Sequence, residues 1–168
     1  TDQLLESTHQ AMADLLHAPS SREIVFGQNM TSLTFALSRA LGHRLKPGDE
    51  IVVTRMDHDA NIRPWVRLAE DTGAIIRWLD FDTETARLRM DRLDEILNER
   101  TKIVAVGLAS NLLGTVNPIS EIAKKVHRFE ALLFVDAVHY APHGVIDVNQ
   151  LGADFLVCSP YKFFGPHQ

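Results

Sequence analysis

The sequence predicts an α/β fold, with a mainly parallel sheet that has helices on both faces. Strand-like and helix-like segments alternate along the whole chain, as they do where helices connect parallel strands. Several strand-like segments, such as residues 103–108 and 132–135, are apolar on consecutive residues. Such runs are typical of strands that are buried on both faces. The 168 residues suffice for one domain with a sizeable core, and they contain no internal repeat, low-complexity segment or flexible linker.

Each element has its own signal in the chain. Apolar residues at helical spacing, bounded by glycine, proline and polar residues, predict helices at residues 1–18, 31–41, 62–72, 91–98 and 121–129. Runs of β-branched and other apolar residues predict strands at residues 23–26, 50–54, 74–79, 103–108, 132–135 and 155–158. The polar stretch 80–89 is predicted to be a loop or small hairpin, and residues 147–151 a short helical or irregular link.

Composition excludes several classes of function. A net charge of −5 and a pI near 5.9 give no basic field for nucleic acid or an anionic membrane. No apolar segment is long enough to span a bilayer. Cys158 is the only cysteine, so neither an internal disulfide nor a cysteine metal cluster is possible, and a reducing cytoplasm is the expected location. The chain lacks a starting methionine and stops just after Gly165 and Pro166, and we therefore expect it to be part of a longer protein.

Parallel sheets bind ligands beyond the carboxyl ends of their strands, so the residues that follow each strand are the candidates for function. After residues 23–26, a turn containing Gln28, Asn29 and Met30 leads into a helix. Free N–H groups and the helix dipole at such a turn suit a phosphate. An ordinary helix N-cap is the alternative.

Two further candidates follow the next strands. His58 comes after residues 50–54 and could stack on a flat heteroaromatic cofactor or transfer a proton. The flanking Asp57 and Asp59 make a metal site conceivable, although the spacing of helical zinc ligands is absent. Asn111 follows residues 103–108 and could donate to a ligand oxygen, or simply form a turn.

The strand at residues 132–135 runs directly into Asp136. A carboxylate at the end of so apolar a run needs a cation or hydrogen-bond donors. A pyridinium N–H would be such a partner, whereas an N-cap or a buried ion pair is the alternative. His139, three residues further on, could reach the same ligand.

The last strand delivers Ser159, Tyr161 and Lys162 to the end of the sheet. An amine that loses its water becomes neutral more easily, and a neutral amine can form a Schiff base with a carbonyl. A solvated lysine is the alternative. Ser159 lacks the Gly-x-Ser-x-Gly elbow of a serine hydrolase.

Taken in order, these clusters resemble the class V aminotransferase-fold enzymes, which are pyridoxal-phosphate proteins of fold type I, and in particular the cysteine desulfurase-like branch. The resemblance runs from about Leu4 to Pro166 and lies in five motifs: Gly27-Gln28-Asn29-Met30-Thr31, Asp57-His58-Asp59-Ala60-Asn61, Ser110-Asn111 with Gly114-Thr115, Val135-Asp136-Ala137, and Ser159 with Lys162. It implies that residues 1–168 are part of a large, pyridoxal 5′-phosphate-binding domain, with the small C-terminal domain absent.

The resemblance also implies a role for each candidate. Lys162 would form the Schiff base with the cofactor and, once freed, carry protons. Asp136 would keep the pyridine nitrogen protonated, and His58 would stack on the ring. The other implied contacts are Asn111 and His139 near the phenolic oxygen, and Gln28, Asn29, Met30, Ser159 and Tyr161 around the phosphate.

Three positions depart from the family pattern. His139 stands where desulfurases commonly have glutamine, Tyr161 where they have histidine, and Asn29 where they have threonine. Each replacement can still form hydrogen bonds, so cofactor binding is expected. His139 bears on reaction specificity, because it would touch the ring-oxygen region that influences proton transfers.

The expected function is that of a pyridoxal-phosphate enzyme acting on an amino acid, with cysteine desulfurase-like carbon–sulfur cleavage as the first choice. In the family, the nucleophilic cysteine and the arginine that holds the substrate carboxylate follow the Schiff-base lysine, so we expect this piece alone to be inactive. Cys158 lies in an apolar strand and is predicted to be a packing residue.

Alternatives are transamination, epimerisation or kynureninase-like cleavage with the same cofactor, a cofactor-free α/β module that binds a phosphorylated metabolite, and a metal hydrolase that uses His58, Asp136 and His139. We expect no bound metal. The resemblance further implies a homodimer with no nucleic-acid or membrane partner, and a sheet that lacks one strand and so exposes an edge.

Overall fold

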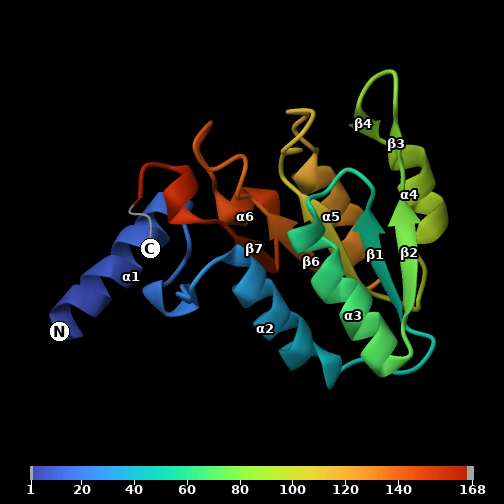
Figure 1. The fold of residues 1–168 in the computed structure, drawn as a ribbon, viewed down its shortest axis with the longest axis horizontal. Helices are drawn as coiled ribbons and strands as arrows, with labels where there is room; N and C mark the ends of the chain where they lie inside the picture. The colour runs from blue at the N-terminus through green and yellow to red at the C-terminus, as the bar shows by residue number, and fades with distance from the viewer. Residues whose placement is uncertain (1, 166–168) are drawn as a thin grey trace.

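A computed structural model describes residues 2–165 and shows a five-stranded sheet in which every pairing is parallel. The strand order is β2-β1-β5-β6-β7. The strands are β1 (Glu50–Thr54), β2 (Ile75–Leu79), β5 (Thr101–Gly107), β6 (Leu132–Asp136) and β7 (Phe155–Val157). All five point the same way, so the segments that follow them gather at one edge of the sheet, the upper edge in Figure 1. The predicted parallel α/β sheet is confirmed.

Helices cover both faces of this sheet, as predicted (Figure 1). On one face α2 (Met30–Gly42) and α3 (Arg63–Thr72) pack against Ile51 and Val53 of β1. On the other face lie α4 (Met90–Ile96), α5 (Ile119–His127), α6 (Val148–Leu151) and the end of α1 (Asp2–Leu16), which share a core with Val52. Successive residues of β1 therefore enter different cores, which explains its continuous apolar sequence.

Local sequence signals set the ends of several elements. Helix α3 has Pro64 in its first turn and ends at Gly73, whose φ of 75° is left-handed and easily reached by glycine. The predicted hairpin at residues 80–89 is confirmed by the antiparallel pair β3 (Phe81–Asp82) and β4 (Arg87–Leu88). Three short 3-10 helices complete the described elements: η1 (Ser21–Glu23), η2 (Asp59–Asn61) and η3 (Pro160–Lys162).

The strand predicted at residues 23–26 is wrong. Glu23 ends η1, and the three residues after it form no strand in the structure. Val25 and Phe26 are 72% and 45% exposed. An apolar run becomes a strand only where a neighbouring strand accepts its backbone hydrogen bonds, and residues 24–26 have no such neighbour in the described sheet, whose last strand on that side is β7.

Other boundaries shift by at most two residues, and one shift matters for the site. Asp136 is the last residue of β6 rather than the residue after it, so its backbone belongs to the ladder. Of the turn predicted at Gly165 and Pro166, the second residue lies outside the described part of the chain.

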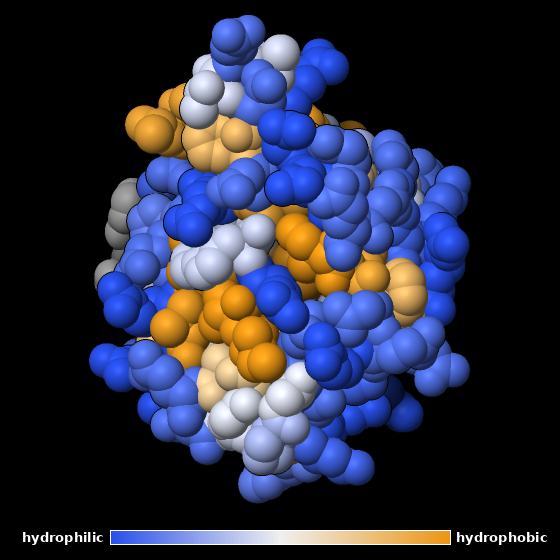
Figure 2. All heavy atoms as spheres, turned by 90° about the vertical axis from the view of Figure 1, so that its right-hand side faces the viewer, coloured by the Kyte–Doolittle hydropathy of each residue, from blue (hydrophilic) through white to orange (hydrophobic). Residues whose placement is uncertain are grey.

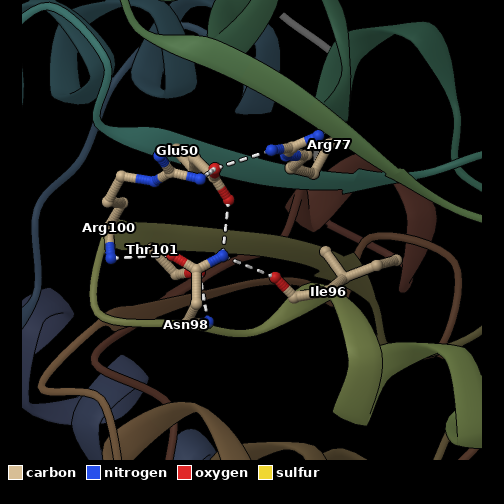
Figure 3. A network of polar contacts seen from close by, with 6 residues as sticks. All are labelled: Glu50, Arg77, Ile96, Asn98, Arg100 and Thr101. Atoms are coloured by element: carbon tan, nitrogen blue, oxygen red, sulfur yellow. Dashed lines mark hydrogen bonds and ion pairs between the residues drawn. The ribbon is translucent and has the colours of Figure 1, made fainter.

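A buried charge network joins the amino ends of β1 and β5, at the end of the sheet opposite to the candidate residues (Figure 3). Glu50 is fully buried, and its carboxylate lies 2.8 Å from the Arg77 guanidinium and 2.9 Å from that of Arg100. Asn98 donates a third bond to it, also at 2.8 Å. The hydrogen bond from Arg77 is the largest influence that lowers the pKa of Glu50, against the effect of burial. No feature of the sequence predicted this network.

The face that carries the free edge of β2 has hydrophobic side chains gathered between hydrophilic ones (Figure 2). Ile75 of β2 is 41% exposed. Among residues 2–165, no helix is both long and apolar enough to cross a membrane.

Candidate functional site

Asp136 lies at the centre of the candidate site, at the carboxyl end of β6. It is paired in register with Gly107 on one side and with Val157 on the other. Its Oδ1 accepts the N–H of Val138 at 2.9 Å, and in the described part of the chain no donor meets its Oδ2. Burial raises the pKa of Asp136, while the Val138 N–H and the nearby His58 and His139 act in the opposite direction. The site therefore holds a carboxyl group with one oxygen left for a cation or a donor.

Two of the predicted histidines lie close enough to Asp136 to act on its charge. His58 caps η2 after β1, where its Nδ1 accepts the N–H of Ala60 at 3.1 Å, and its ring is exposed. His139 is half-buried after β6, and its ring centroid lies 5.4 Å from that of His143. The structure thus brings together three predicted residues that come from two strand ends.

The neighbouring Asp57 has a part in the site that the sequence did not reveal. Its Oδ1 accepts the N–H of Gly107 at 2.8 Å, and its Oδ2 accepts an amide hydrogen of Asn61 at 3.1 Å. Asn61 is fully buried and in turn accepts the indole N–H of Trp65 at 3.4 Å. This chain of hydrogen bonds ties the turn that carries His58 to both β5 and α3.

Burial raises the pKa of Asp57 to about 7, and the negative charge of Asp136 adds to that effect. Hydrogen bonds from Gly107, Thr54 and Asn61 act in the opposite direction. Asp57 and Asp136 are therefore two carboxyl groups that influence each other at one end of the sheet.

Asn117 is a second residue that sequence reasoning missed. It is 4% exposed, and its side-chain amide donates to the carbonyl of Gly107 at 2.8 Å. The N–H and the C=O of Gly107 are thus both bound by side chains, at the point where β1 has ended beside β5. The signal for Asp57 was the glycine that closes an apolar strand, since only a residue without a Cβ leaves room for its carboxyl group.

The candidate phosphate turn lies at the start of α2. Asn29 is its N-cap, and its Oδ1 accepts the N–H of Ser32 at 2.9 Å. Gln28 and Asn29 are exposed, whereas Met30 is 4% exposed and belongs to the core. The N-cap reading is therefore correct, and the remaining first-turn N–H groups of a 13-residue helix stay suited to an anion.

The remaining candidates also lie on segments that follow strands. Asn111 is exposed in the turn after β5. Ser159 is 3% exposed, whereas Tyr161 and Lys162 are exposed in η3. The Lys162 Nζ lies 5.3 Å from the centroid of the Tyr161 ring. The structure places these residues on the segments that follow β5 and β7, as expected.

Cys158 has the character predicted for it. It is half-buried against the core that contains β5 and β6, and burial raises the pKa of its thiol to about 11. Since the thiolate is the nucleophile, this environment disfavours catalysis by Cys158.

Among residues 2–165, no group of three or more His, Cys, Asp and Glu side chains could hold a metal ion. The alternative of a metal hydrolase built on His58, Asp136 and His139 therefore has no ligand cluster to support it.

Comparison with known proteins now adds to the geometry. The family model of class V aminotransferases matches residues 1–167. The chain belongs to the class V aminotransferase family.

Similar curated proteins point to one branch of that family. The chain is 38% identical over 162 residues to a probable cysteine desulfurase of Halalkalibacterium halodurans, with 96% of this chain and 40% of the relative covered. It is 38% identical over 165 residues to a cysteine desulfurase of Yersinia pseudotuberculosis, covering 98% and 40% of the two chains. It is 42% identical over 166 residues to the aminotransferase-like protein FGM3 of Gibberella zeae, again covering 98% and 40%. The chain thus spans about 40% of the length of these relatives.

Solved structures confirm the fold. The crystal structure of the cysteine desulfurase CsdA from Escherichia coli superimposes with a TM-score of 0.92 at 32% identity, covering 96% of this chain and 41% of that one. An apo cysteine desulfurase from Thermococcus onnurineus gives a TM-score of 0.89 at 32% identity, covering 95% and 39%. The sheet and its helices are therefore those of a fold type I enzyme.

Proposed function

We propose that this chain forms the cofactor-binding part of a pyridoxal-phosphate enzyme that acts on an amino acid, with cysteine desulfurase-like cleavage of a carbon–sulfur bond as its reaction. The observation that carries the proposal is the half-buried Asp136 at the end of β6, with one carboxyl oxygen left for a donor and two histidines beside it. The family to which the chain belongs and its similarity to cysteine desulfurases support the choice of reaction.

The residues present fit pyridoxal 5′-phosphate. A protonated pyridine nitrogen would give Asp136 the cationic partner that a buried carboxylate needs. The exposed ring of His58 stands close by to cover a flat heterocycle. The N-terminus of α2 offers N–H groups and a favourable dipole to a phosphate, with Gln28, Asn29 and Met30 around it.

When bound, the cofactor supplies an electron sink for the negative charge that develops at the substrate α-carbon. Asp136 would support that chemistry by keeping the ring nitrogen protonated, since loss of the proton would leave its buried charge without a partner. Lys162 would hold the cofactor and, once free, would move a proton at the substrate α-carbon. Asn111 and His139 would bind near the phenolic oxygen, and Ser159 and Tyr161 would complete the phosphate site.

Carbon–sulfur cleavage further requires a thiol that accepts sulfur. Cys158 is not that group, because its thiol is half-buried and has a pKa of about 11. The accepting cysteine and the group that binds the substrate carboxylate are therefore proposed to come from residues outside this chain.

The test of cofactor binding uses the intact protein and its Lys162→Ala variant. Adding pyridoxal 5′-phosphate should produce a visible absorption band in the wild type that the variant lacks. Borohydride reduction followed by peptide mapping should place the modification on Lys162. Lys102→Ala is the matched control and should behave as wild type, because Lys102 lies at the opposite end of β5. Identical spectra for wild type and Lys162→Ala would contradict the proposal.

The reaction is tested separately, by sulfide release from cysteine against a panel of amino acids. Desulfuration predicts sulfide from cysteine and none from Lys162→Ala. Transamination, epimerisation and kynureninase-like cleavage are the competing reactions of the same cofactor, and His139 is the departure from the family pattern that bears on this choice. Because one relative is named aminotransferase-like protein FGM3, the products of transamination are measured as well. Formation of a keto acid without sulfide would contradict desulfuration and would support transamination as the reaction.

We also propose that the intact protein is a cytoplasmic homodimer with no nucleic-acid or membrane partner, and that residues 1–168 belong to its large domain. Sedimentation of the intact protein at several concentrations tests the dimer. A cofactor-free module that binds a phosphorylated metabolite is the alternative from another class, and it predicts phosphate-ester binding that Lys162→Ala leaves unchanged.

A further inference from the structure

The carboxyl group of Asp57 links two strand ends through a hydrogen bond. It starts in the turn after β1 and binds the backbone N–H of Gly107 at the end of β5, at 2.8 Å. Gly107 is the register partner of Asp136. Asp57 therefore connects the turn that carries His58 with the pair of strands that carries Asp136.

The Asp57 carboxyl group packs so closely against Gly107 that a larger residue at position 107 would not fit. A Cβ at position 107 would lie 2.5 Å from Oδ1 of Asp57, which is closer than such atoms approach one another. The next nearest atom, the carbonyl oxygen of Ala109, would be at an ordinary 3.5 Å. A glycine is therefore required at position 107 because of the Asp57 carboxyl group, and not because of neighbouring backbone atoms.

The other side of Asp57 is equally fixed. Asn61 donates to Oδ2 at 3.1 Å and is itself fully buried against the indole N–H of Trp65. His58 lies between Asp57 and Asn61 in the sequence, so both ends of its turn are fixed. Its side chain uses Nδ1 for the N–H of Ala60, which sets the orientation of the ring.

We propose that Asp57 is a positioning residue, whose hydrogen bond to Gly107 holds the His58 ring at a fixed place relative to Asp136. The proposal rests on the proposed function for its ligand, since the ring held in this way is the one that would cover the cofactor. Asp57 itself need not touch the cofactor. The charged and titratable groups that face it are Asp136 and, beyond that carboxyl, His58 and His139.

A double-mutant cycle on the intact protein tests the proposal, with pyridoxine 5′-phosphate as the probe. This compound has the pyridine ring and the phosphate but no aldehyde, so Lys162 cannot capture it covalently. Asp57→Ala removes the hydrogen bond, and Gly107→Ala displaces the carboxyl group that makes it. Each single variant should weaken binding of the probe by about tenfold or more, as expected for a lost bond to a charged group.

The double variant decides whether these effects have one origin. In the Asp57→Ala background the Cβ at position 107 has no carboxyl oxygen to meet, so Gly107→Ala should add almost nothing. Asp57→Asn keeps an acceptor oxygen for Gly107 but turns its NH2 group toward the donating amide of Asn61, so it should restore binding only in part. Asp59→Ala, on the same turn with an exposed side chain, should leave binding unchanged. Fully additive single effects would overturn the proposal.

A second measurement needs no ligand. Hydrogen exchange of the Gly107 amide should accelerate by about tenfold or more in Asp57→Ala and stay near the wild-type rate in Asp57→Asn. Unchanged exchange in Asp57→Ala would overturn the hydrogen bond itself. If wild-type protein fails to bind pyridoxine 5′-phosphate, the proposed function fails, and the exchange rates alone decide whether Asp57 holds the turn.

Discussion

Asp57 and Asp136 are the same type of residue, yet different groups surround their charges. Asp136 keeps an oxygen for a further donor and has two histidines nearby. Asp57 uses both oxygens within the protein and faces the charge of Asp136. The position of each carboxyl group therefore decides whether it can bind a further group or is used within the protein.

The titration of Asp57 gives a prediction about stability. Its folded pKa of about 7 is above the ordinary value of 3.8, so the folded state binds this proton more tightly than the unfolded state does. The stability that this carboxyl contributes is fully present below about pH 3.8 and is lost as the pH rises through about 7. Between these values, the free energy of unfolding of wild type relative to Asp57→Asn should fall by up to about 1.4 kcal/mol per pH unit.

Urea unfolding at several pH values checks this difference. Asp59→Asn is the matched control and should follow the wild-type curve, because its side chain is 69% exposed. Parallel curves for wild type and Asp57→Asn would show that Asp57 titrates normally.

Cys158 gives a prediction about reactivity. With a thiol pKa of about 11 instead of the usual 8.5 or so, the thiolate fraction near pH 8 falls by at least about 100-fold. Alkylation by iodoacetamide under native conditions should be slower than in urea by a similar factor, as measured by mass spectrometry. Equal rates in the folded and unfolded protein would contradict the buried position of this thiol.

At the scale of the elements, the strands are held together differently at their two ends. The amino ends of β1 and β5 share the Glu50 network (Figure 3). At the carboxyl ends, Asp57 and Asn117 bind the backbone of Gly107. The first network is far from the candidate site and can be tested without affecting it.

Glu50→Gln should destabilise the fold by about 2 kcal/mol. Breaking a fully buried ion pair loses about 3–5 kcal/mol, but the Arg77 and Arg100 side chains are 43% and 62% exposed and can turn to water. Because the pKa of Glu50 is lowered, its contribution is present above the ordinary value of 4.5 and lost as the pH falls below it.

Denaturant unfolding at pH 7 measures this effect. Glu95→Gln breaks an exposed pair with Arg92 and should change the free energy of unfolding by less than about 0.5 kcal/mol. A loss no larger than in this control would show that the Glu50 network does not stabilise the sheet.

Helix α2 gives a prediction that separates capping from phosphate binding. Asn29→Ala should lower stability by about 1 kcal/mol because it removes the N-cap bond to Ser32. Asn29→Ser keeps a capping oxygen and should restore most of that stability in thermal unfolding. If both variants weaken binding of pyridoxine 5′-phosphate equally, the amide of Asn29 has a role beyond the cap.

At the scale of the whole molecule, apolar side chains lie exposed near α1 and the segment that follows it. Val25 and Phe26 are 72% and 45% exposed, and Leu4 and Leu5 of α1 are 70% and 55% exposed. Figure 1 shows α1 extending away from the sheet. Exposed apolar groups of this kind favour association.

We therefore expect the 168-residue chain, taken alone, to associate at micromolar concentration. Replacing Val25 and Phe26 together by lysine should reduce the associated fraction severalfold in sedimentation velocity experiments. Leu112→Lys is the control, since Leu112 is 84% exposed on a distant turn after β5. Association unaffected by the Val25 and Phe26 changes would direct attention to another surface, such as the β2 face in Figure 2.

Much of this molecule could be predicted from the sequence. Apolar runs, helical spacing and turn residues such as Gly73 gave a parallel α/β sheet with helices on both faces, because these signals are local and repeat along the chain. The order of the polar motifs after the strands gave the family. Asp136 with His58 and His139 could be foreseen as one group because the carboxyl ends of parallel strands share an edge.

Only the tertiary structure decided the rest, since those features depend on which segments become neighbours. Residues 24–26 have the sequence of a strand but no partner in the described sheet, and Glu50 reads as an ordinary strand residue until Arg77 and Arg100 surround it. Asp57 reads as one acidic residue in a polar turn, and its role became visible only where its carboxyl group meets the N–H of Gly107. A hydrogen bond between residues 50 positions apart leaves no periodic pattern in the sequence, because it is specified by the folded geometry alone.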